Sequence, residues 1–428
     1  MSFRGGIPVG VAAMIVVSAT IAYQQGRADE RDGVSTPWAR DAMAQDRTLL
    51  VSSTEARGGR DAYYPNTETL EPDEMRIIAC GTGMPTGRES QAAACFLVEL
   101  GNGDKFIFDS GTGSHVRISS LEIPYDFLDK IFVSHLHTDH FGDFAAYYIG
   151  GWVAGRSVPL RVWGPSGPSE ELGTRYALEH WKEALAWDRA NRVGRLPASG
   201  GELEINEFDY MGENQVVYEE TGVVIRSFPA IHGIDGSVSY RLEWNGLSFV
   251  FGGDTYPNQW LVRYAQEADV VVHEAMMAVE DYIEKFRFPP SLALEIGVQI
   301  HTSPESFGKV MSMVKPRMAI AYHFFNDFDT RERIGLGIRS TYDGPLSMAT
   351  DYMVWNVTKD EIRTRMAEVN PDVWPPPSAY PRSEIDQSGM MFISPEVNSG
   401  KLPEAMDVDD TIYDRINAAY GTNYRLRR

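Results

Sequence analysis

The sequence contains little cysteine for its length. Only Cys80 and Cys95 occur among 428 residues, and their spacing matches no thiolate metal motif. In an exported protein two cysteines on neighbouring strands can form a disulfide; the alternative is a pair of buried thiols, and the sequence slightly favours the thiols.

Basic residues are also scarce. Lysine and arginine number 39 against 60 aspartates and glutamates, which gives a net charge of −21, and no basic run interrupts the middle of the chain. An electrostatic field of that sign repels phosphate backbones, so we expect no nucleic-acid partner. The apolar fraction of 43% is sufficient for a sizeable core.

Long apolar runs are absent except at the N-terminus. Arg4 precedes an apolar run over 7–23, which has small residues near its end and is followed by a polar stretch. This layout is typical of a secretory signal. An uncleaved anchor is the alternative, since the run approaches the lower length limit for crossing a bilayer, ~17 residues. We therefore expect residues 1–23 to be a signal peptide or anchor, the protein to be periplasmic or secreted, and no stable membrane partner unless this segment is retained.

The rest of the chain alternates strand and helix patterns, which predicts a layered α/β/β/α sandwich. Residues 24–74 are interpreted as an N-terminal arm, 75–368 as the catalytic domain with a helical insert at about 145–201, and 369–428 as a Pro-rich extension. That extension would lie over the domain or across a partner subunit, so a homodimer is one expectation. Helices are predicted over 176–190 and from Thr302 or Ser303, with capping-box spacing between Thr302 and Glu305. The predicted strands span 75–79, 95–100, 105–109, 130–134, 160–163, 223–228, 238–244, 247–251, 270–273 and 318–322.

The run HLHTDH at 135–140 is the strongest chemical signal. His135 and His137 are two residues apart at a predicted strand end, so both can reach one metal ion. Asp139 and His140 follow directly and can reach a second metal position. Imidazole and carboxylate ligands suit zinc, and would also fit manganese or iron. Three more candidate ligands each follow a predicted strand: His232, Asp254 and His323.

The longer run HLHTDHFGD resembles the central motif of the metallo-β-lactamase superfamily. The similarity extends from about Met75 to Phe325 and is nearest to the branch with ribonuclease Z and the periplasmic arylsulfatases of this type. The turn Gly81-Thr82-Gly83, Asp109 with Gly111 and Gly113, and the run LRVWGPSG at 160–167 resemble that branch as well.

The resemblance implies a four-layer αβ/βα sandwich with a helical insertion, a C-terminal extension and two zinc ions. His135, His137 and His232 would hold the first ion. Asp139, His140 and His323 would hold the second, and Asp254 would bridge both.

Two divalent ions about 3.5–4 Å apart can share a water and lower its pKa to near neutral, which makes a hydroxide nucleophile. Asp139 would orient that hydroxide. Glu274 and His301 are the candidates to protonate the leaving group, because the ribonuclease Z branch carries a similar Glu and His. The alternative for His301 is a helix cap or a surface position, and His273 is expected to pack within the fold.

These residues predict a metal-dependent hydrolase acting on a small-molecule substrate, with a phosphate or sulfate ester preferred. Opening of a lactone or β-lactam ring, or amide hydrolysis, is the alternative because the same hydroxide attacks a carbonyl. A tRNA 3′-processing endonuclease ranks lower for an exported, acidic chain. A non-catalytic scaffold also ranks lower, since no ligand is missing.

Aromatic residues near the motif allow two interpretations: walls of an apolar substrate pocket, or ordinary packing, which is favoured. They are Tyr147, Tyr148, Trp152, Trp181, Trp187, Phe324 and Phe325.

Overall fold

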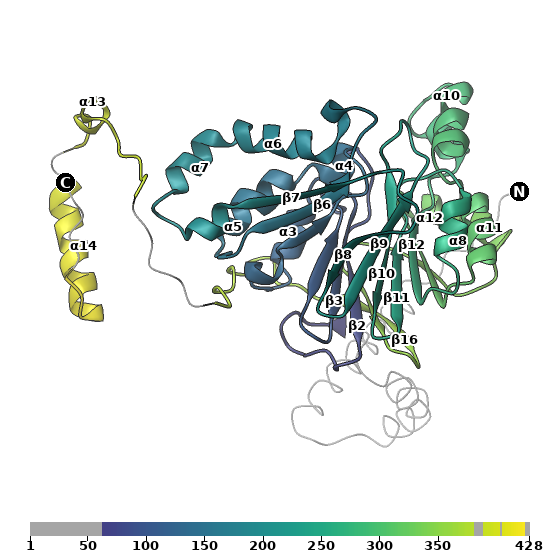
Figure 1. Ribbon diagram of the computed structural model, residues 1–428, viewed down its shortest axis with the longest axis horizontal. Coiled ribbons are helices and arrows are strands. Elements are labelled where there is room, and N and C mark those ends of the chain that lie inside the picture. Colours follow the sequence, from purple (N-terminus) through teal and green to yellow (C-terminus); the bar gives the residue numbers. More distant parts are fainter. Residues whose placement is uncertain (1–61, 381–387, 403–404, 424–428) are drawn as a thin grey trace, which may run out of the picture. The chain divides into compact units, whose positions relative to one another are not determined.

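A computed structural model describes residues 62–380, 388–402 and 405–423 (Figure 1). The predicted signal segment 1–23 and the arm residues 24–61 lie outside this part. Within the described ranges, no helix combines the length and apolarity needed to cross a bilayer.

Two β-sheets form the centre of the fold. The nine-stranded sheet has the order β1-β16-β15-β2-β3-β4-β5-β6-β7, and the seven-stranded sheet the order β14-β13-β12-β11-β10-β9-β8. Residues 62–63 of the predicted arm therefore belong to the first sheet as β1, which pairs with β16. The strands are β1 Ala62–Tyr63, β2 Met75–Gly81, β3 Cys95–Leu100, β4 Lys105–Phe108, β5 Lys130–Phe132, β6 Leu160–Pro165, β7 Leu203–Phe208, β8 Gln215–Glu220, β9 Val223–Pro229, β10 Val238–Trp244, β11 Leu247–Phe251, β12 Val270–Glu274, β13 Met318–Tyr322, β14 Leu346–Met348, β15 Met353–Val357 and β16 Ile362–Ala367.

Three apolar clusters separate the layers. One lies between the sheets and includes Phe251, whose ring centroid lies 5.8 Å from that of Phe96 and 5.9 Å from that of Phe108. A second packs one face of the larger sheet against helices of the insert, and a third packs the smaller sheet against helices of the second half. Strands such as β2 and β11 are buried throughout, as their continuous apolar runs predict. The predicted four-layer αβ/βα sandwich is confirmed.

Helices flank both sheets, and several differ from the predictions. The helix predicted over 176–190 is broken at Leu185 into α6 and α7, and α11 begins at Pro304 with Ser303, not Thr302, as its cap. The helices are α3 Ser114–Ser119, α4 Thr138–Phe141, α5 Gly151–Val153, α6 Thr174–Ala184, α7 Ala186–Arg192, α8 Gln259–Tyr264, α9 Val279–Glu284, α10 Pro290–Glu295, α11 Pro304–Val314, α12 Phe328–Arg339, α13 Pro395–Asn398 and α14 Ala405–Tyr420.

The aromatic residues near the metal-ligand motif mostly pack inside the fold. Tyr147, Tyr148 and Trp152 lie in the cluster under the larger sheet, and Phe324 lies in the cluster under the smaller one. Trp187 is 82% exposed on α7. The packing interpretation is therefore the correct one for the four buried rings.

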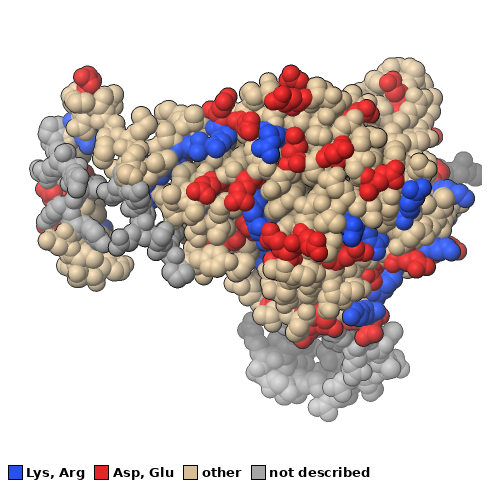
Figure 2. Space-filling model, in the orientation of Figure 1, with Lys and Arg blue, Asp and Glu red and all other residues tan. Residues whose placement is uncertain are grey.

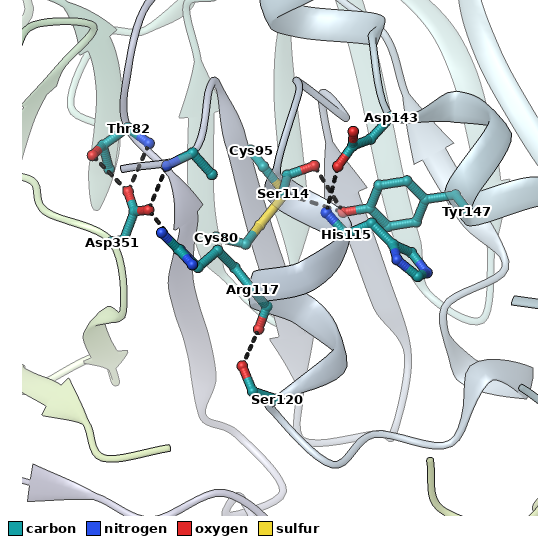
Figure 3. The surroundings of a disulfide bond; sticks show 11 residues. Cys80, Thr82, Cys95, Ser114, His115, Arg117, Ser120, Asp143, Tyr147 and Asp351 are labelled. Carbon is teal, nitrogen blue, oxygen red and sulfur yellow. Dashed lines mark hydrogen bonds and ion pairs between the residues drawn. A yellow bond between two sulfur atoms is a disulfide. The ribbon is translucent and has the colours of Figure 1, made fainter. Parts of the chain in front are cut away.

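The two cysteines form a disulfide, so the expectation of buried thiols is wrong. Cys80 and Cys95 join β2 to β3 where a bulge shifts the register of this antiparallel pair (Figure 3). Both residues are fully buried, and Cys95 Sγ lies 3.7 Å from the hydroxyl of Tyr147. The antiparallel pairing of β2 with β3, with the register shift at Cys80, places the two cysteines side by side, which their spacing of fifteen residues alone did not predict.

The strand directions bring the chemically important ends together. Strands β4 to β7 run parallel, as do β11 to β14. The two sheets meet at this edge, where Val238 N donates to Ser134 O and the Tyr240 hydroxyl donates to Val133 O. Side chains that follow β5, β11 and β13 therefore face one region.

Candidate metal centre

Three histidines converge on one point at the exposed side of this region. His137 Nδ1 lies 3.0 Å from His135 Nε2 and 3.1 Å from His232 Nε2. His135 follows β5, His137 caps α4, and His232 follows β9. Burial lowers the pKa of each imidazole, that of His232 to about 4. Uncharged at neutral pH, the three rings can offer lone pairs to a single cation.

A second group lies deeper. His323 Nε2 is 3.1 Å from Asp139 Oδ2 and 3.4 Å from His140 Nε2. All three side chains are almost completely buried. They come from α4 and from the end of β13, which are far apart in the sequence.

Asp254 connects the two groups. Its Oδ2 lies 3.2 Å from His140 Nε2, 3.1 Å from His323 Nε2 and 3.8 Å from His232 Nε2. Burial alone would raise the pKa of Asp254, but the imidazoles of His140 and His323 hold it well below its usual range. One carboxylate oxygen is thus shared between both groups.

The donor set fits a pair of cations. Asp139 Oδ1 and Asp254 Oδ1 are buried without a hydrogen-bond partner among the described residues. Such atoms are costly unless an unseen partner satisfies them. Burial lowers the pKa of His140, but the nearby carboxylates outweigh this effect and raise that pKa well above its usual value. The region therefore attracts positive charge. Nitrogen and carboxylate ligands without thiolates suit zinc.

Asp109 fixes the orientation of His140. Its Oδ2 lies 2.6 Å from His140 Nδ1 and accepts from the Ser134 hydroxyl at 2.7 Å, while its Oδ1 accepts from Ser134 N. Asp109 is fully buried and has a positive φ of 61° just after β4. A proton held on His140 Nδ1 leaves Nε2 free to act as a ligand. The sequence placed Asp109 at the end of the predicted strand 105–109 and in a segment that resembles the superfamily, without assigning it this role; its position at the end of a buried strand was the available signal.

His323 adopts an uncommon backbone conformation. Its φ is 73°, and its N–H donates to the carbonyl of Thr82 at 3.0 Å. Thr82 is in turn held by Asp351, which accepts from both its N–H and its hydroxyl (Figure 3). A non-glycine residue keeps a left-handed backbone conformation only where the surrounding contacts hold it there.

His301 and Glu274 form a buried pair beside this centre. His301 Nδ1 lies 2.7 Å from Glu274 Oε2 and 3.8 Å from Asp254 Oδ2. Burial opposes protonation, but the Glu274 carboxylate raises the pKa of His301 to about 9. The pair directs Nε2, the other ring nitrogen of His301, away from Glu274. His301 is buried and so is not a surface residue; it stands at the C-cap position of the helical turn Ile296–Ile300, and its side chain is directed to Glu274.

A hydrogen-bonded network that the sequence did not predict supports this pair. Glu274 Oε1 accepts from Thr255 N, and the Thr302 hydroxyl donates to Thr255 O at 2.6 Å. That hydroxyl also accepts from His273 Nε2 at 3.2 Å. The predicted packing position of His273 is confirmed, since it is fully buried. Threonine hydroxyls carry no sequence pattern that would have marked them.

Residues 85–324 match the model of the β-lactamase superfamily domain, which is more than half of the chain. The chain belongs to the metallo-β-lactamase superfamily. A protein named ribonuclease Z from Mycobacterium sp. (strain KMS) is 26% identical over 255 residues, covering 58% of this chain and 84% of that protein. Ribonuclease Z of Mycobacterium marinum (strain ATCC BAA-535 / M) is 28% identical over 216 residues, covering 50% and 74%.

Among solved structures, the metallo-β-lactamase fold protein YhfI from Bacillus subtilis superposes with a TM-score of 0.50 at 15% identity. It covers 67% of this chain and 100% of that one. At this identity the likeness shows the fold alone. As a member of this superfamily the protein is a hydrolase, and its candidate ligand clusters agree with metal binding.

Proposed function

We propose that this metallo-β-lactamase superfamily member is a two-zinc hydrolase of small phosphate or sulfate esters. The observation that carries the proposal is the buried His301–Glu274 pair, which lies beside the His/Asp cluster with 2.7 Å between Nδ1 and Oε2. An ester with an alkoxide leaving group needs a proton at the moment of bond cleavage, and a positioned imidazole is suited to supply it.

In this proposal each side chain has a distinct task. His135, His137 and His232 would hold one ion, Asp139, His140 and His323 the other, and Asp254 both. When bound, a pair of divalent ions supplies an activated water and neutralises charge on the substrate oxygens.

Around that pair the protein positions protons. Glu274 holds His301 through Nδ1, so that the proton on Nε2 can pass to the ester oxygen as it leaves. Asp139 Oδ1, which has no partner among the described residues, would orient the attacking water.

Two alternatives make different demands on the site. A lactone or β-lactam ring opens at a carbonyl and depends less on an acid beside the leaving group. Cleavage of RNA is a second candidate because the relatives are named ribonuclease Z. The net charge of −21 opposes it, since RNA binding depends on neutralising phosphates.

We further propose that the protein is exported to the periplasm or secreted. The Cys80–Cys95 disulfide supports this location, because disulfides persist in oxidising compartments and are rare in the cytosol. The apolar run over 7–23 supports it independently. Residues 1–30 fused to a reporter that is active only outside the cytosol test the proposal; an inactive reporter would contradict it.

A substrate panel tests the chemistry directly. The purified, zinc-loaded chain is assayed with a p-nitrophenyl phosphodiester, an aryl sulfate, a lactone and a cephalosporin. We expect turnover of at least one of the first two. Turnover restricted to the lactone or the cephalosporin would reject the ester assignment.

The His301→Ala variant tests the proton donor. We expect the rate with an alkyl phosphodiester to fall by about 10²–10⁴-fold, and less with p-nitrophenyl esters, whose leaving group departs without a proton. Bound metal, measured by elemental analysis, should be unchanged. The His180→Ala variant, on the exposed side of α6, is the control. Equal losses on both ester types would show that His301 is not the acid.

A further inference from the structure

The segment 275–300 is closed at its base by the His301–Glu274 pair. Glu274 ends β12 and His301 follows the helical turn Ile296–Ile300, so the contact of 2.7 Å between their side chains joins the two ends of this segment. Helices α9 and α10 lie within it, and α10 stands beyond one end of the smaller sheet (Figure 1). A side chain on the inner side of the segment therefore lies close to the candidate metal centre.

Tyr282 of α9 is such a side chain. It is 2% exposed and belongs to the same apolar cluster as Met276, whose Sδ lies 3.3 Å from His323 Nδ1. Its ring also packs on that of Phe286, which in turn stacks on Phe325 with 5.9 Å between the ring centroids. Both sets of contacts connect Tyr282 to the stretch of chain that carries the ligand His323.

The hydroxyl of Tyr282 is buried and has no hydrogen-bond partner among the described residues. Burial raises the pKa of this phenol, and the carboxylates of Glu274, Asp254 and Asp281 raise it further. The hydroxyl is therefore protonated at neutral pH and lies within the electrostatic field of carboxylates that belong to the centre. A buried donor of this kind is costly unless a ligand or an ordered water accepts its proton.

The chemistry of the unpaired oxygens indicates which ligand this is. Asp139 Oδ1 and Asp254 Oδ1 can only accept, so cations satisfy them, whereas the Tyr282 hydroxyl has a proton to donate. An anionic oxygen held by the same cations would accept that proton, and hydrogen bonds to charged acceptors are the stronger ones. Phosphate and sulfate groups both carry such oxygens.

The two cations of the segment 275–300 do not compete for this role. Lys285 Nζ contacts Asp329 and Thr330 at the start of α12, and Arg287 is exposed. The surface over α10 is mostly uncharged in the view of Figure 2. What this segment offers to an anion at the centre is thus a neutral donor.

A second buried hydroxyl without a partner among the described residues, that of Tyr322, is excluded by its position. Its ring lies between the two sheets, with its centroid 5.2 Å from that of Phe96 and 5.8 Å from that of Phe251. Apolar side chains fill this layer, so it offers no room for a substrate.

We propose that the Tyr282 hydroxyl donates a hydrogen bond to an anionic oxygen of the phosphate or sulfate group of the substrate. This inference rests on the proposed function, because it takes the substrate to be an ester of one of these acids. His301 would act on the oxygen that leaves, and Tyr282 on an oxygen that stays bound to phosphorus or sulfur. Tyr282 keeps its proton throughout.

Binding of inorganic phosphate to the zinc-loaded protein, measured by calorimetry, tests the contact without turnover. We expect Tyr282→Phe to raise the Kd for phosphate by about 10-fold, as for the loss of a hydrogen bond to a charged acceptor, with bound zinc unchanged. The matched control is Tyr342→Phe, which removes a hydroxyl that donates to Pro345 O in the same apolar cluster and should leave the Kd unchanged. Equal Kd values for Tyr282→Phe and the unmodified protein, or an unmodified protein that binds no phosphate, would overturn the proposal.

Thermal stability separates a binding role of Tyr282 from a structural one. Tyr282→Phe removes a hydroxyl that makes no hydrogen bond to the described residues, so the Tm measured without phosphate should stay the same or rise. A clear fall in this Tm would mean that the hydroxyl stabilises the fold, and the binding role would be rejected.

Turnover separates this inference from the proposed function. With the ester that the substrate panel identifies, Tyr282→Phe should lower kcat/KM by a factor similar to the change in the Kd for phosphate. An unaffected kcat/KM would reject the role of Tyr282 and leave the hydrolase proposal standing. A protein that hydrolyses no ester, but whose phosphate binding depends on Tyr282, would reject the ester hydrolase and support the contact.

Discussion

At the scale of single residues, the candidate centre depends on side chains that do not themselves face a metal ion. Asp109 holds His140 through Nδ1, and Thr302 links His273 to the backbone beside Glu274. Neither residue stands out in the sequence as the histidines do. Their roles arise from contacts between strands and loops that are distant in the chain.

Replacing Asp109 by Asn should weaken the second metal position. Without the carboxylate, His140 loses the partner that fixes its ring, and comparable losses lower metal affinity by about 10–100-fold. Elemental analysis after dialysis should then find close to one ion per chain, against two in the unmodified protein. Asp126→Asn, which removes another buried carboxylate far from the centre, is the control and should retain both ions. Two tightly held ions in Asp109→Asn would contradict this role.

Replacing Thr302 by Val should disturb the His301–Glu274 pair. The change removes the bond to Thr255 O and leaves His273 Nε2 without its acceptor, which costs about 1–3 kcal/mol of unfolding free energy. We expect a lower kcat with bound metal unchanged. Thr302→Ser keeps the hydroxyl and should restore both kcat and stability. If the Ser variant is as impaired as the Val variant, the hydroxyl is not the important group.

At the scale of elements, the disulfide between β2 and β3 lies just before the turn that holds His323. Gly81 follows Cys80, and the next residue, Thr82, accepts the N–H of His323. A side chain at Gly81 would collide with the backbone carbonyl of Ala93, so this turn requires glycine. The disulfide and the glycine together keep the end of β2 close to β3.

Removing the disulfide should destabilise the whole domain. In the chain-entropy description, a crosslink that closes a loop of about 15 residues contributes about 3 kcal/mol. The double variant Cys80→Ala/Cys95→Ala should therefore unfold at lower denaturant concentration than the oxidised protein. Reductant should lower the midpoint of the unmodified protein and leave that of the double variant unchanged. A midpoint unaffected by reductant would indicate that the bond is absent in solution.

At the scale of the whole molecule, the two halves of the fold are joined at the proposed metal centre. Its ligands follow β5 of one sheet and β9, β11 and β13 of the other. Ions bound there would therefore stabilise the packing of one half on the other. An ion that binds only the folded state, present at one hundred times its Kd, adds about 2.7 kcal/mol per site to the free energy of unfolding.

Removing metal should consequently lower the Tm. We expect a strong chelator to reduce the Tm of the purified chain, and added zinc to restore it. The variant His135→Ala/His323→Ala removes one ligand from each group, and its Tm should not respond to either treatment. A Tm of the unmodified protein that is insensitive to both chelator and zinc would count against a structural metal centre.

The sequence by itself determined the fold class and most strand positions. Its apolar runs are long enough to bury strands on both faces, and four ligand-type residues within HLHTDH identify the chemistry locally. The sequence also indicated His232, Asp254 and His323 as candidate ligands, because each follows an apolar strand, and the structure brings their side chains close to this motif.

Only the tertiary structure decided how these residues combine. Strand pairing brought Asp109 to His140, a bulge brought Cys80 to Cys95, and Leu185 divided one predicted helix into two. The hydroxyls of the Thr255–Thr302 network also became evident only there. Local periodicity reports which side chains are buried, whereas contacts between distant segments depend on strand order and register, which a single sequence does not specify.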